Sequence, residues 1–276
     1  MNPSDLFSTD FFTARRRFLE AAEKVGARTG SVLNPHTQGP KGEPLFMDWS
    51  WQGPDDAEAV LLTLSGTHGA EGLCGSAAQL QCLRETDHLH EYPSLAVLHV
   101  HAVNPFGYAH LVRVNEHNVD LNRNWVDFSQ PVPDNAVYDL VHPRLPTRGD
   151  FDDELLDEWM SVYTAGRAEF GDWAFEDAMA RGQYKHPSGV KFGGFARQWS
   201  GTALTALLGR QCGSVEHVAY MDWHSLVDRG DGNLMFLCLN DPGDPLHRRV
   251  QRWWGNDVWH TASTQPRRPG RCGLLM

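Results

Sequence analysis

The sequence has few cysteines, and their placement matches no familiar cysteine pattern. The five, Cys74, Cys82, Cys212, Cys238 and Cys272, are odd in number, widely scattered and form no C-x-x-C pair. Such a set argues against a disulfide framework and against a zinc site built from thiolates. Reduced thiols are the simplest account, and they fit the cytoplasmic location that we expect.

Long apolar runs and an excess of positive charge are also missing. The apolar runs fall far short of the ~20 residues that a membrane-spanning helix needs, and we expect no signal peptide at the N-terminus. The formal net charge of −11 argues against nucleic acid or an anionic membrane as a partner. No G-x-S-x-G motif is present, so a serine hydrolase is not indicated. With 276 residues, 41% of them hydrophobic, we expect a single globular domain.

The sequence does contain an alternation of predicted strands and helices. Strand-like apolar runs occupy residues 45–51, 57–66, 95–105, 217–225 and 233–240. Helical patterns occupy residues 11–26, 71–85, 151–182 with a break near Gly171, 202–210 and 245–260. Ser8 or Thr9 is the expected cap of the first helix, and the proline-rich segment 127–150 is expected to be a surface excursion. This order predicts an α/β fold, in which ligands gather beyond the carboxyl ends of the strands.

The first polar block, SGTHGAEGLCGS, follows one of these strands and contains His68 and Glu71. An imidazole and a carboxylate three residues apart, at a tight turn entering a helix, can converge on one cation. Alone the pair is weak evidence, because a helix-start glutamate beside an ordinary histidine is common. A third ligand is needed, and His224 leaves the end of the strand HVAYMDW. We therefore predict one Zn²⁺ ion held by His68, Glu71 and His224, with an open position for water.

The second block, NPFGYAHLVRVNEHNVDLNRNW, strengthens this interpretation. Together the blocks closely resemble the zinc carboxypeptidase family, the carboxypeptidase A-like metallopeptidases, and most nearly a bacterial branch with SGxHGxEG and VDLNRN motifs. The resemblance covers residues 6–250. It implies a three-layer α/β/α sandwich around a mixed, largely parallel sheet, and it implies His68, Glu71 and His224 as the ligands.

The resemblance also implies roles for four residues of the second block. Asn122 and Arg123 look like the pair that binds the terminal carboxylate of the substrate, a planar anion that suits a guanidinium fork. Arg113 looks like the catalytic arginine that polarises the scissile carbonyl and holds the oxyanion. Asp120 resembles the carboxylate that orients a zinc histidine through its other ring nitrogen. By contrast, His99 and His101 are predicted to be packed or on the surface rather than metal-bound.

One part of the family pattern is absent. The family's mechanism uses a glutamate downstream of the third ligand as general base, and this sequence has no glutamate after Glu216. The carboxylates beyond His224 are Asp228, Asp231, Asp241, Asp244 and Asp257, and none matches the family's position. The tail 261–276 has neither a strand nor a helix pattern. We therefore expect a chain that lacks the C-terminal elements of the family.

These observations leave three functions open. The leading hypothesis is a zinc-dependent hydrolase that cleaves an amide next to a free carboxylate, on a peptide or an acyl-amino acid. A second is a small-molecule deacylase resembling aspartoacylase and succinylglutamate desuccinylase, which share the ligand pattern. A third is a catalytically inactive module that keeps zinc and anion binding. The sequence does not fix the oligomeric state.

Overall fold

The structure is a computed structural model that describes residues 3–146, 152–225, 236–238, 243–255 and 258–260. Its centre is a five-stranded sheet with the strand order β1-β2-β4-β3-β5. The strands are β1 (Arg28–Gln38), β2 (Pro44–Gln52), β3 (Ala59–Ser65), β4 (Leu95–His101) and β5 (His217–Trp223). β3 pairs in parallel with β4 and β5, whereas β2 pairs antiparallel with β1 and β4. The sheet is therefore mixed, as predicted, with its parallel part around β3.

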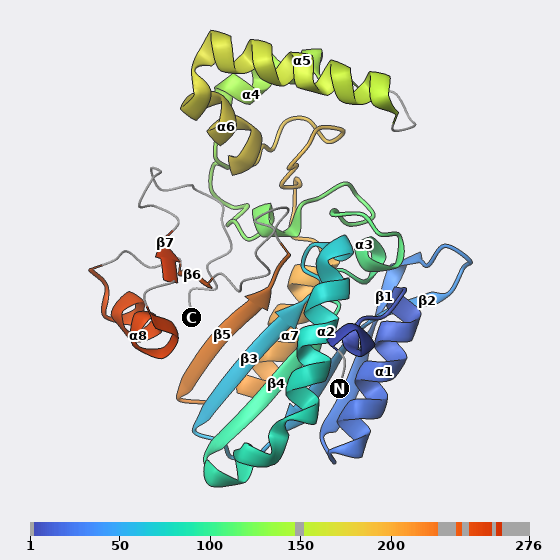
Figure 1. The fold of residues 1–276 in the computed structure, drawn as a ribbon, viewed down its shortest axis with the longest axis vertical. Coiled ribbons are helices and arrows are strands. Elements are labelled where there is room, and N and C mark those ends of the chain that lie inside the picture. The colour runs from blue at the N-terminus through green and yellow to red at the C-terminus, as the bar shows by residue number, and fades with distance from the viewer. Residues whose placement is uncertain (1–2, 147–151, 226–235, 239–242, 256–257, 261–276) are drawn as a thin grey trace.

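Helices cover both faces of this sheet. Helices α1 (Phe11–Lys24) and α2 (Gly72–Arg84) lie in front of it in Figure 1, and α7 (Trp199–Cys212) lies behind. The main core joins the β3 and β4 side chains Leu62 and Leu98 to Leu204 of α7, all fully buried. Burial of such side chains stabilises a fold by about 1.5–3 kcal/mol each. The predicted three-layer α/β/α class is confirmed.

The first helix begins at Phe11 as predicted, but its cap is a different residue. The cap is Asp10, whose carboxylate accepts a hydrogen bond from the amide of Thr13 at 2.9 Å, rather than Ser8 or Thr9. The Ser8 hydroxyl instead accepts from Arg17 at 3.0 Å, so it is engaged elsewhere. A carboxylate cap also suits the positive end of the helix dipole. Gly26, with φ +70°, follows the helix as expected.

A second group of helices stands beyond the arrowhead end of β3 and β5 (Figure 1). It comprises α4 (Ala136–Val141), α5 (Asp153–Phe170) and α6 (Asp172–Arg181). The expected surface excursion at 127–150 is therefore wrong in part, because α4 buries Tyr138 and Val141 against Phe175 of α6. The predicted break at Gly171 is confirmed by its φ of +81°.

The remaining elements are short. They are α3 (Pro105–Ala109), α8 (Pro245–Trp254), a parallel pair β6 (Phe236–Cys238) and β7 (Val258–His260), and the 3-10 turns η1 (Pro3–Leu6), η2 (Gly69–Glu71), η3 (Thr86–Glu91), η4 (Leu121–Arg123) and η5 (His142–Arg144). The helix predicted over 245–260 is too long, because Gly255 at φ +78° ends it and β7 follows. The tail 261–276 and residues Asp228, Asp231, Asp241, Asp257 and Cys272 lie outside the described residues. None of the described helices has the length and apolar character needed to cross a membrane.

Candidate metal site

The loop that carries His68 and Glu71 is fixed by a close backbone approach. It leaves β3 and enters α2 through η2, so both side chains lie at the carboxyl end of β3. Gly69 packs directly on the backbone of Gly107, where a Cβ atom would overlap the Gly107 carbonyl carbon. The amide of Gly69 also donates to the Arg113 carbonyl at 3.2 Å. The two polar blocks of the sequence are thus interlocked through main-chain contacts.

His224 reaches the same place from β5, the strand next to β3 in the sheet. It directly follows β5, which pairs in parallel with β3 so that Ser65 lies opposite Trp223. Because the carboxyl ends of parallel strands meet at one edge, His224 arrives beside His68 although they are far apart in sequence. The centroids of the two rings lie 4.8 Å apart.

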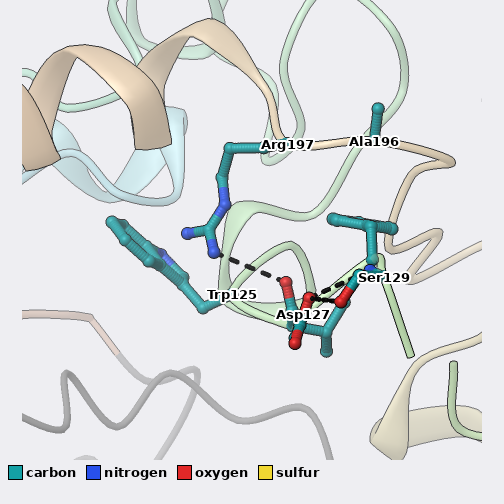
Figure 2. A pocket seen from close by; sticks show the side chains of 7 residues that line it. Trp125, Asp127, Ser129, Ala196 and Arg197 are labelled. Carbon is teal, nitrogen blue, oxygen red and sulfur yellow. Dashed lines mark hydrogen bonds between the residues drawn. The ribbon is translucent and has the colours of Figure 1, made fainter. Parts of the chain in front are cut away.

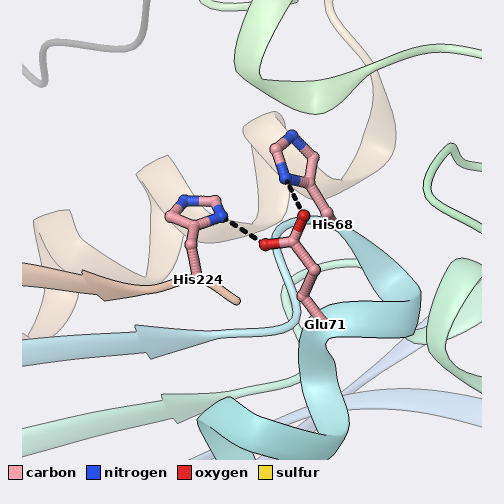
Figure 3. A group of neighbouring side chains, drawn as sticks. All are labelled: His68, Glu71 and His224. Carbon is pink, nitrogen blue, oxygen red and sulfur yellow. Dashed lines mark hydrogen bonds and ion pairs between the residues drawn. The ribbon is translucent and has the colours of Figure 1, made fainter. Parts of the chain in front are cut away.

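Glu71 lies between the two histidines (Figure 3). Its Oε1 is 2.9 Å from His68 Nδ1, and its Oε2 is 2.8 Å from His224 Nδ1. The three possible ligand atoms all lie within 4.8 Å of one another. Ligands about 2.1 Å from a tetrahedral zinc lie roughly 3.4 Å apart, so this spacing is close to what the ion requires. Two imidazoles and one carboxylate also form a donor set that is known from catalytic zinc sites.

Asp120 lies on the far side of the His68 ring. Its Oδ1 is 3.2 Å from His68 Nε2 and accepts from the amide of Asn122 at 3.0 Å, while its Oδ2 accepts from Arg113 Nε at 3.0 Å. The carboxylate is completely buried. This is the position from which it would orient His68 with Nδ1 turned toward the cluster.

Arg113 bridges the two carboxylates of this cluster. Its Nη1 donates to Glu71 Oε1 at 3.1 Å, and its side chain is 38% exposed. Its Nη2 also lies 2.7 Å from His68 Nε2. That nitrogen cannot donate to Asp120 and accept from Arg113 at the same time, since it carries either a hydrogen or a lone pair. If His68 Nε2 carries a hydrogen that it donates to Asp120, it offers Arg113 no lone pair.

The charges of the cluster reinforce one another. Burial alone would raise the pKa of Glu71, but hydrogen bonds from His224 and His68 hold it well below its usual range. Asp120 behaves in the same way, with His68 and then Arg113 outweighing burial and lowering its pKa. Burial would lower the pKa of His224, yet its bonds to Asp222 and Glu71 raise it to about 10. Both carboxylates are therefore ionised, as metal ligation and orientation require.

The remaining predicted residues, Asn122 and Arg123, are placed differently from each other. The Asn122 side-chain nitrogen lies 3.5 Å from His224 Nε2, at the edge of the cluster. Arg123 is only 6% exposed, and its Nη2 donates to the Ala180 carbonyl at 2.6 Å. Its Nη1 donates to the Asn122 carbonyl at 3.1 Å, while its buried Nε has no hydrogen-bond partner among the described residues. In this arrangement, two of its guanidinium nitrogens already serve the backbone.

Three residues near the cluster were missed from the sequence. Asp222 contacts His224 Nε2 at 2.9 Å, and Thr67 donates to Asp222 at 3.0 Å. Lys191 lies 3.8 Å from Asp120, and burial, followed by the charge of Arg113, lowers its pKa to about 8. Asp222 had a usable signal, because residues two apart on a strand project from the same face. The sequence gives no such signal for Lys191, because Lys191 lies in a glycine-rich loop that has no regular periodicity.

A separate cavity of about 430 Å³ lies beside the end of the second polar block (Figure 2). It is lined by residues 125–129 and by Ala196 and Arg197. Arg197 lies over the ring of Trp125 at 4.7 Å and donates to the Val126 carbonyl at 3.4 Å. Asp127 accepts from the amide and hydroxyl of Ser129, so its charge is used within its own turn. No metal-cluster residue lines this cavity.

Comparison with solved structures finds distant likenesses. Carboxypeptidase A from Helicoverpa armigera is 13% identical with a TM-score of 0.45, over 84% of this chain and 48% of that one. Bovine thrombin-activatable fibrinolysis inhibitor is 12% identical with a TM-score of 0.47, over 87% of this chain and 65% of that one. A protein from Shewanella amazonensis SB2B, described as of the succinylglutamate desuccinylase/aspartoacylase family, is 16% identical with a TM-score of 0.29, over 51% and 44%. The chain thus spans about half to two thirds of the length of these structures.

Comparison with curated proteins gives no match. One family model does match, over residues 7–275, and its description is "Protein of unknown function (DUF2817)". That match covers both polar blocks, β5 with His224 and nearly all of the remaining chain. The chain therefore belongs to the DUF2817 family.

Proposed function

We propose that this protein is a zinc-dependent hydrolase that cleaves an amide bond next to a free carboxylate. The observation that carries the proposal is the meeting of His68, Glu71 and His224 within 4.8 Å, although Glu71 and His224 are 153 positions apart in the chain. The motif resemblance to the zinc carboxypeptidases supports it independently, because it rests on the sequence alone. Zinc would be held by the two imidazoles and the Glu71 carboxylate.

A zinc ion in such a set supplies Lewis acidity and lowers the pKa of bound water to about 7. The protein's own part is to hold the ligands and to bind the substrate. Asp120 fixes the His68 ring from its far nitrogen, at 3.2 Å. Glu71 is kept ionised by its two histidine partners, so no proton has to leave it before a cation binds.

Arg113 is the proposed contact for the substrate carbonyl. It is more than one-third exposed, and it lies beside both Glu71 and Asp120. A guanidinium that donates to a developing oxyanion stabilises charge where it forms, which is often the largest contribution to catalysis. Asn122 and Arg123 are proposed to receive the terminal carboxylate. Asn122 stands at the cluster edge, and Arg123 would turn Nη2 from Ala180 to make a direct contact.

The three carboxylates of the cluster, those of Glu71, Asp120 and Asp222, each face a histidine nitrogen. A general base typically contributes 10²–10⁴-fold to the rate, and in this arrangement none of the three carboxylates is free to act as one. This arrangement favours a second candidate function, a module that binds zinc and an anionic ligand without turnover. The deacylase alternative differs from the leading one only in substrate size.

Metal content tests the core of the proposal. Purified protein should hold one zinc per chain, whereas the variants His68→Ala and His224→Ala should hold little. His217→Ala is the matched control, because His217 lies at the start of β5 and its side chain is 72% exposed. Equal zinc in all four proteins, or none in the wild type, would refute the metal site.

A substrate panel separates the candidate functions. It pairs short peptides and N-acyl-amino acids with the same compounds carrying a C-terminal carboxamide. The leading proposal expects cleavage of the free acids and at least a tenfold lower kcat/KM for the amides. Cleavage of acyl-amino acids alone would identify the deacylase. Stoichiometric zinc without cleavage of any compound would identify the binding module.

A further inference from the structure

The His224 ring faces a carboxylate at each of its two nitrogen atoms. Its Nδ1 lies 2.8 Å from Glu71 Oε2, and its Nε2 lies 2.9 Å from Asp222 Oδ2. The second oxygen of Asp222 accepts a hydrogen bond from Thr67 Oγ1 at 3.0 Å. The Asp222 side chain is 10% exposed, and Thr67 is buried. A largely shielded carboxylate whose two oxygens both have partners has one defined orientation.

The two histidines of the cluster are arranged alike. Each turns Nδ1 toward the shared Glu71 carboxylate, and each turns Nε2 toward an aspartate, Asp120 for His68 and Asp222 for His224. Each aspartate is held in turn by a donor on its own side, the Asn122 amide or the Thr67 hydroxyl. The motifs SGxHGxEG and VDLNRN contain the first pair, His68 and Asp120, but neither residue of the second pair, His224 and Asp222.

We propose that Asp222, held by Thr67, is the positioning residue that fixes His224 as a metal ligand through Nδ1. The inference rests on the proposed zinc site and deepens it. A carboxylate at Nε2 keeps the hydrogen on that nitrogen, so the lone pair of the neutral ring stays on Nδ1, the atom that faces Glu71. It also increases the basicity of the ligating nitrogen. The loss of such a partner typically costs 10–100-fold in metal affinity.

Strand register explains why this pair can form. β3 and β5 run in parallel with Leu64 opposite Asp222 and Ser65 opposite Trp223. Thr67 lies just beyond β3, next to His68, so its hydroxyl reaches the neighbouring strand where Asp222 projects. Asp222 and His224 lie two residues apart and therefore project from the same side of the chain. The segment 67–71 thus supplies two ligands and the residue that anchors the third ligand's partner.

The side chain of Asn122 also lies near the same nitrogen, but at a longer distance than the Asp222 carboxylate. The side-chain nitrogen of Asn122 is 3.5 Å from His224 Nε2, at the limit of a hydrogen bond, whereas Asp222 is at 2.9 Å. A charge-assisted bond at the shorter distance is the stronger of the two. The ring orientation is therefore assigned to Asp222.

The first experiment measures zinc affinity alone, by competition with a chromophoric chelator at neutral pH. We expect Asp222→Asn to bind zinc 10–100-fold more weakly than the wild type and Thr67→Val to bind it 2–10-fold more weakly. The double variant should bind like Asp222→Asn, because Thr67 acts only through Asp222. Asp55→Asn is the control, since its side chain is 84% exposed and pairs with Arg28. Wild-type affinity in Asp222→Asn, or additive losses in the double variant, would overturn the proposal.

The second experiment does not depend on any variant folding. Nitrogen-15 NMR of the zinc-loaded wild type should show His224 with its hydrogen on Nε2 and the ion on Nδ1. The opposite assignment would overturn the proposal while leaving the zinc site intact.

If the wild type binds no zinc, or His224→Ala binds it equally well, the proposed function fails and this inference fails with it. An effect of Asp222→Asn on zinc affinity without a change in melting temperature would exclude a purely structural role.

Discussion

His68 Nε2 lies 3.2 Å from Asp120 Oδ1, although 52 residues separate them in sequence. Three other groups surround the same carboxylate: Arg113, Lys191 and the Asn122 amide. Because the side chain is completely buried, its charge depends on these partners rather than on water. The contact thus links His68, a proposed metal ligand, to the second polar block, whose residues are proposed to bind the substrate.

Asp120→Asn should weaken zinc binding 10–100-fold, because an amide oxygen is a poorer acceptor for the His68 ring hydrogen. It should also lower the melting temperature, since Arg113 and Lys191 lose a buried counter-charge. Chelator competition and thermal unfolding measure the two effects. Asp134→Asn is the control, because that carboxylate pairs with Lys185 and its side chain is 65% exposed. Unchanged zinc affinity in Asp120→Asn would remove Asp120 from the site.

Gly69→Ala should disrupt the site without touching any ligand. Its Cβ would overlap the Gly107 backbone, so one of the two interlocked loops must move. We expect a loss of more than 2 kcal/mol in the free energy of unfolding, in the range of severe packing strain, together with weaker zinc binding. Gly209→Ala is the opposite case. Gly209 lies in α7 with open space around its Cβ position, so alanine should stabilise the helix by about 0.5–1 kcal/mol.

Acid should destabilise the protein before its carboxylates titrate. His99 and His101 are fully buried on β4, and burial lowers their pKa values to about 4 and about 3. Between the unfolded pKa of about 6.5 and these folded values, the unfolded chain binds more protons. The free energy of unfolding should therefore fall as the pH falls through this window, by up to ~1.4 kcal/mol per pH unit for each histidine.

Denaturant unfolding at pH 7, 6 and 5, with a chelator present, measures that slope. His99→Gln and His101→Gln should each reduce it, and the double variant should reduce it further. His36→Gln should leave it unchanged, because His36 is exposed on β1. A slope that stays at the wild-type value in the double variant would mean that other groups cause the acid sensitivity.

Leu204→Ala tests the layer behind the sheet. Leu204 is fully buried where α7 packs on β3 and β4, so removing three carbon atoms leaves a cavity. We expect a loss of 2–5 kcal/mol in the free energy of unfolding, read from the denaturation midpoint. Leu140→Ala in α4 should cost under 0.5 kcal/mol, because Leu140 is 58% exposed. Equal losses in the two variants would contradict the assignment of α7 to the core.

Local patterns were sufficient to predict most of the fold. Apolar runs marked β2, β3, β4 and β5, and the break at Gly171 followed from its residue type. The errors have two sources. Asp10 caps α1 through a local bond to the Thr13 amide, so its residue type offered the same signal as Ser8 and Thr9, and the engagement of Ser8 by Arg17 distinguishes them only in the structure. α4 forms within a proline-rich segment because Tyr138 finds a buried place beside α6, and that contact has no signature within a short window of sequence.

For the site as well, local patterns predicted some residues and missed others. The spacing of His68 and Glu71 and the strand end at His224 pointed to a shared location, where the structure brings the three together. Asp222 and Thr67 were missed because their contact depends on the register between β3 and β5, which are separated by about half the chain. The direction of the Arg123 side chain toward Ala180 depends likewise on where α6 packs. Sequence motifs predicted the site residues, while strand pairing determined which of them touch.

Glu71 and His224 are 153 positions apart along the chain. A cation bound by both would act as a reversible cross-link between distant segments, closing a loop of the size for which long disulfides have their greatest entropic effect. Such a ligand binds the native chain and not the unfolded one, so each tenfold rise in free ion above the dissociation constant would add about 1.4 kcal/mol to stability. The supply of free zinc would then regulate how long this protein survives as well as what it does.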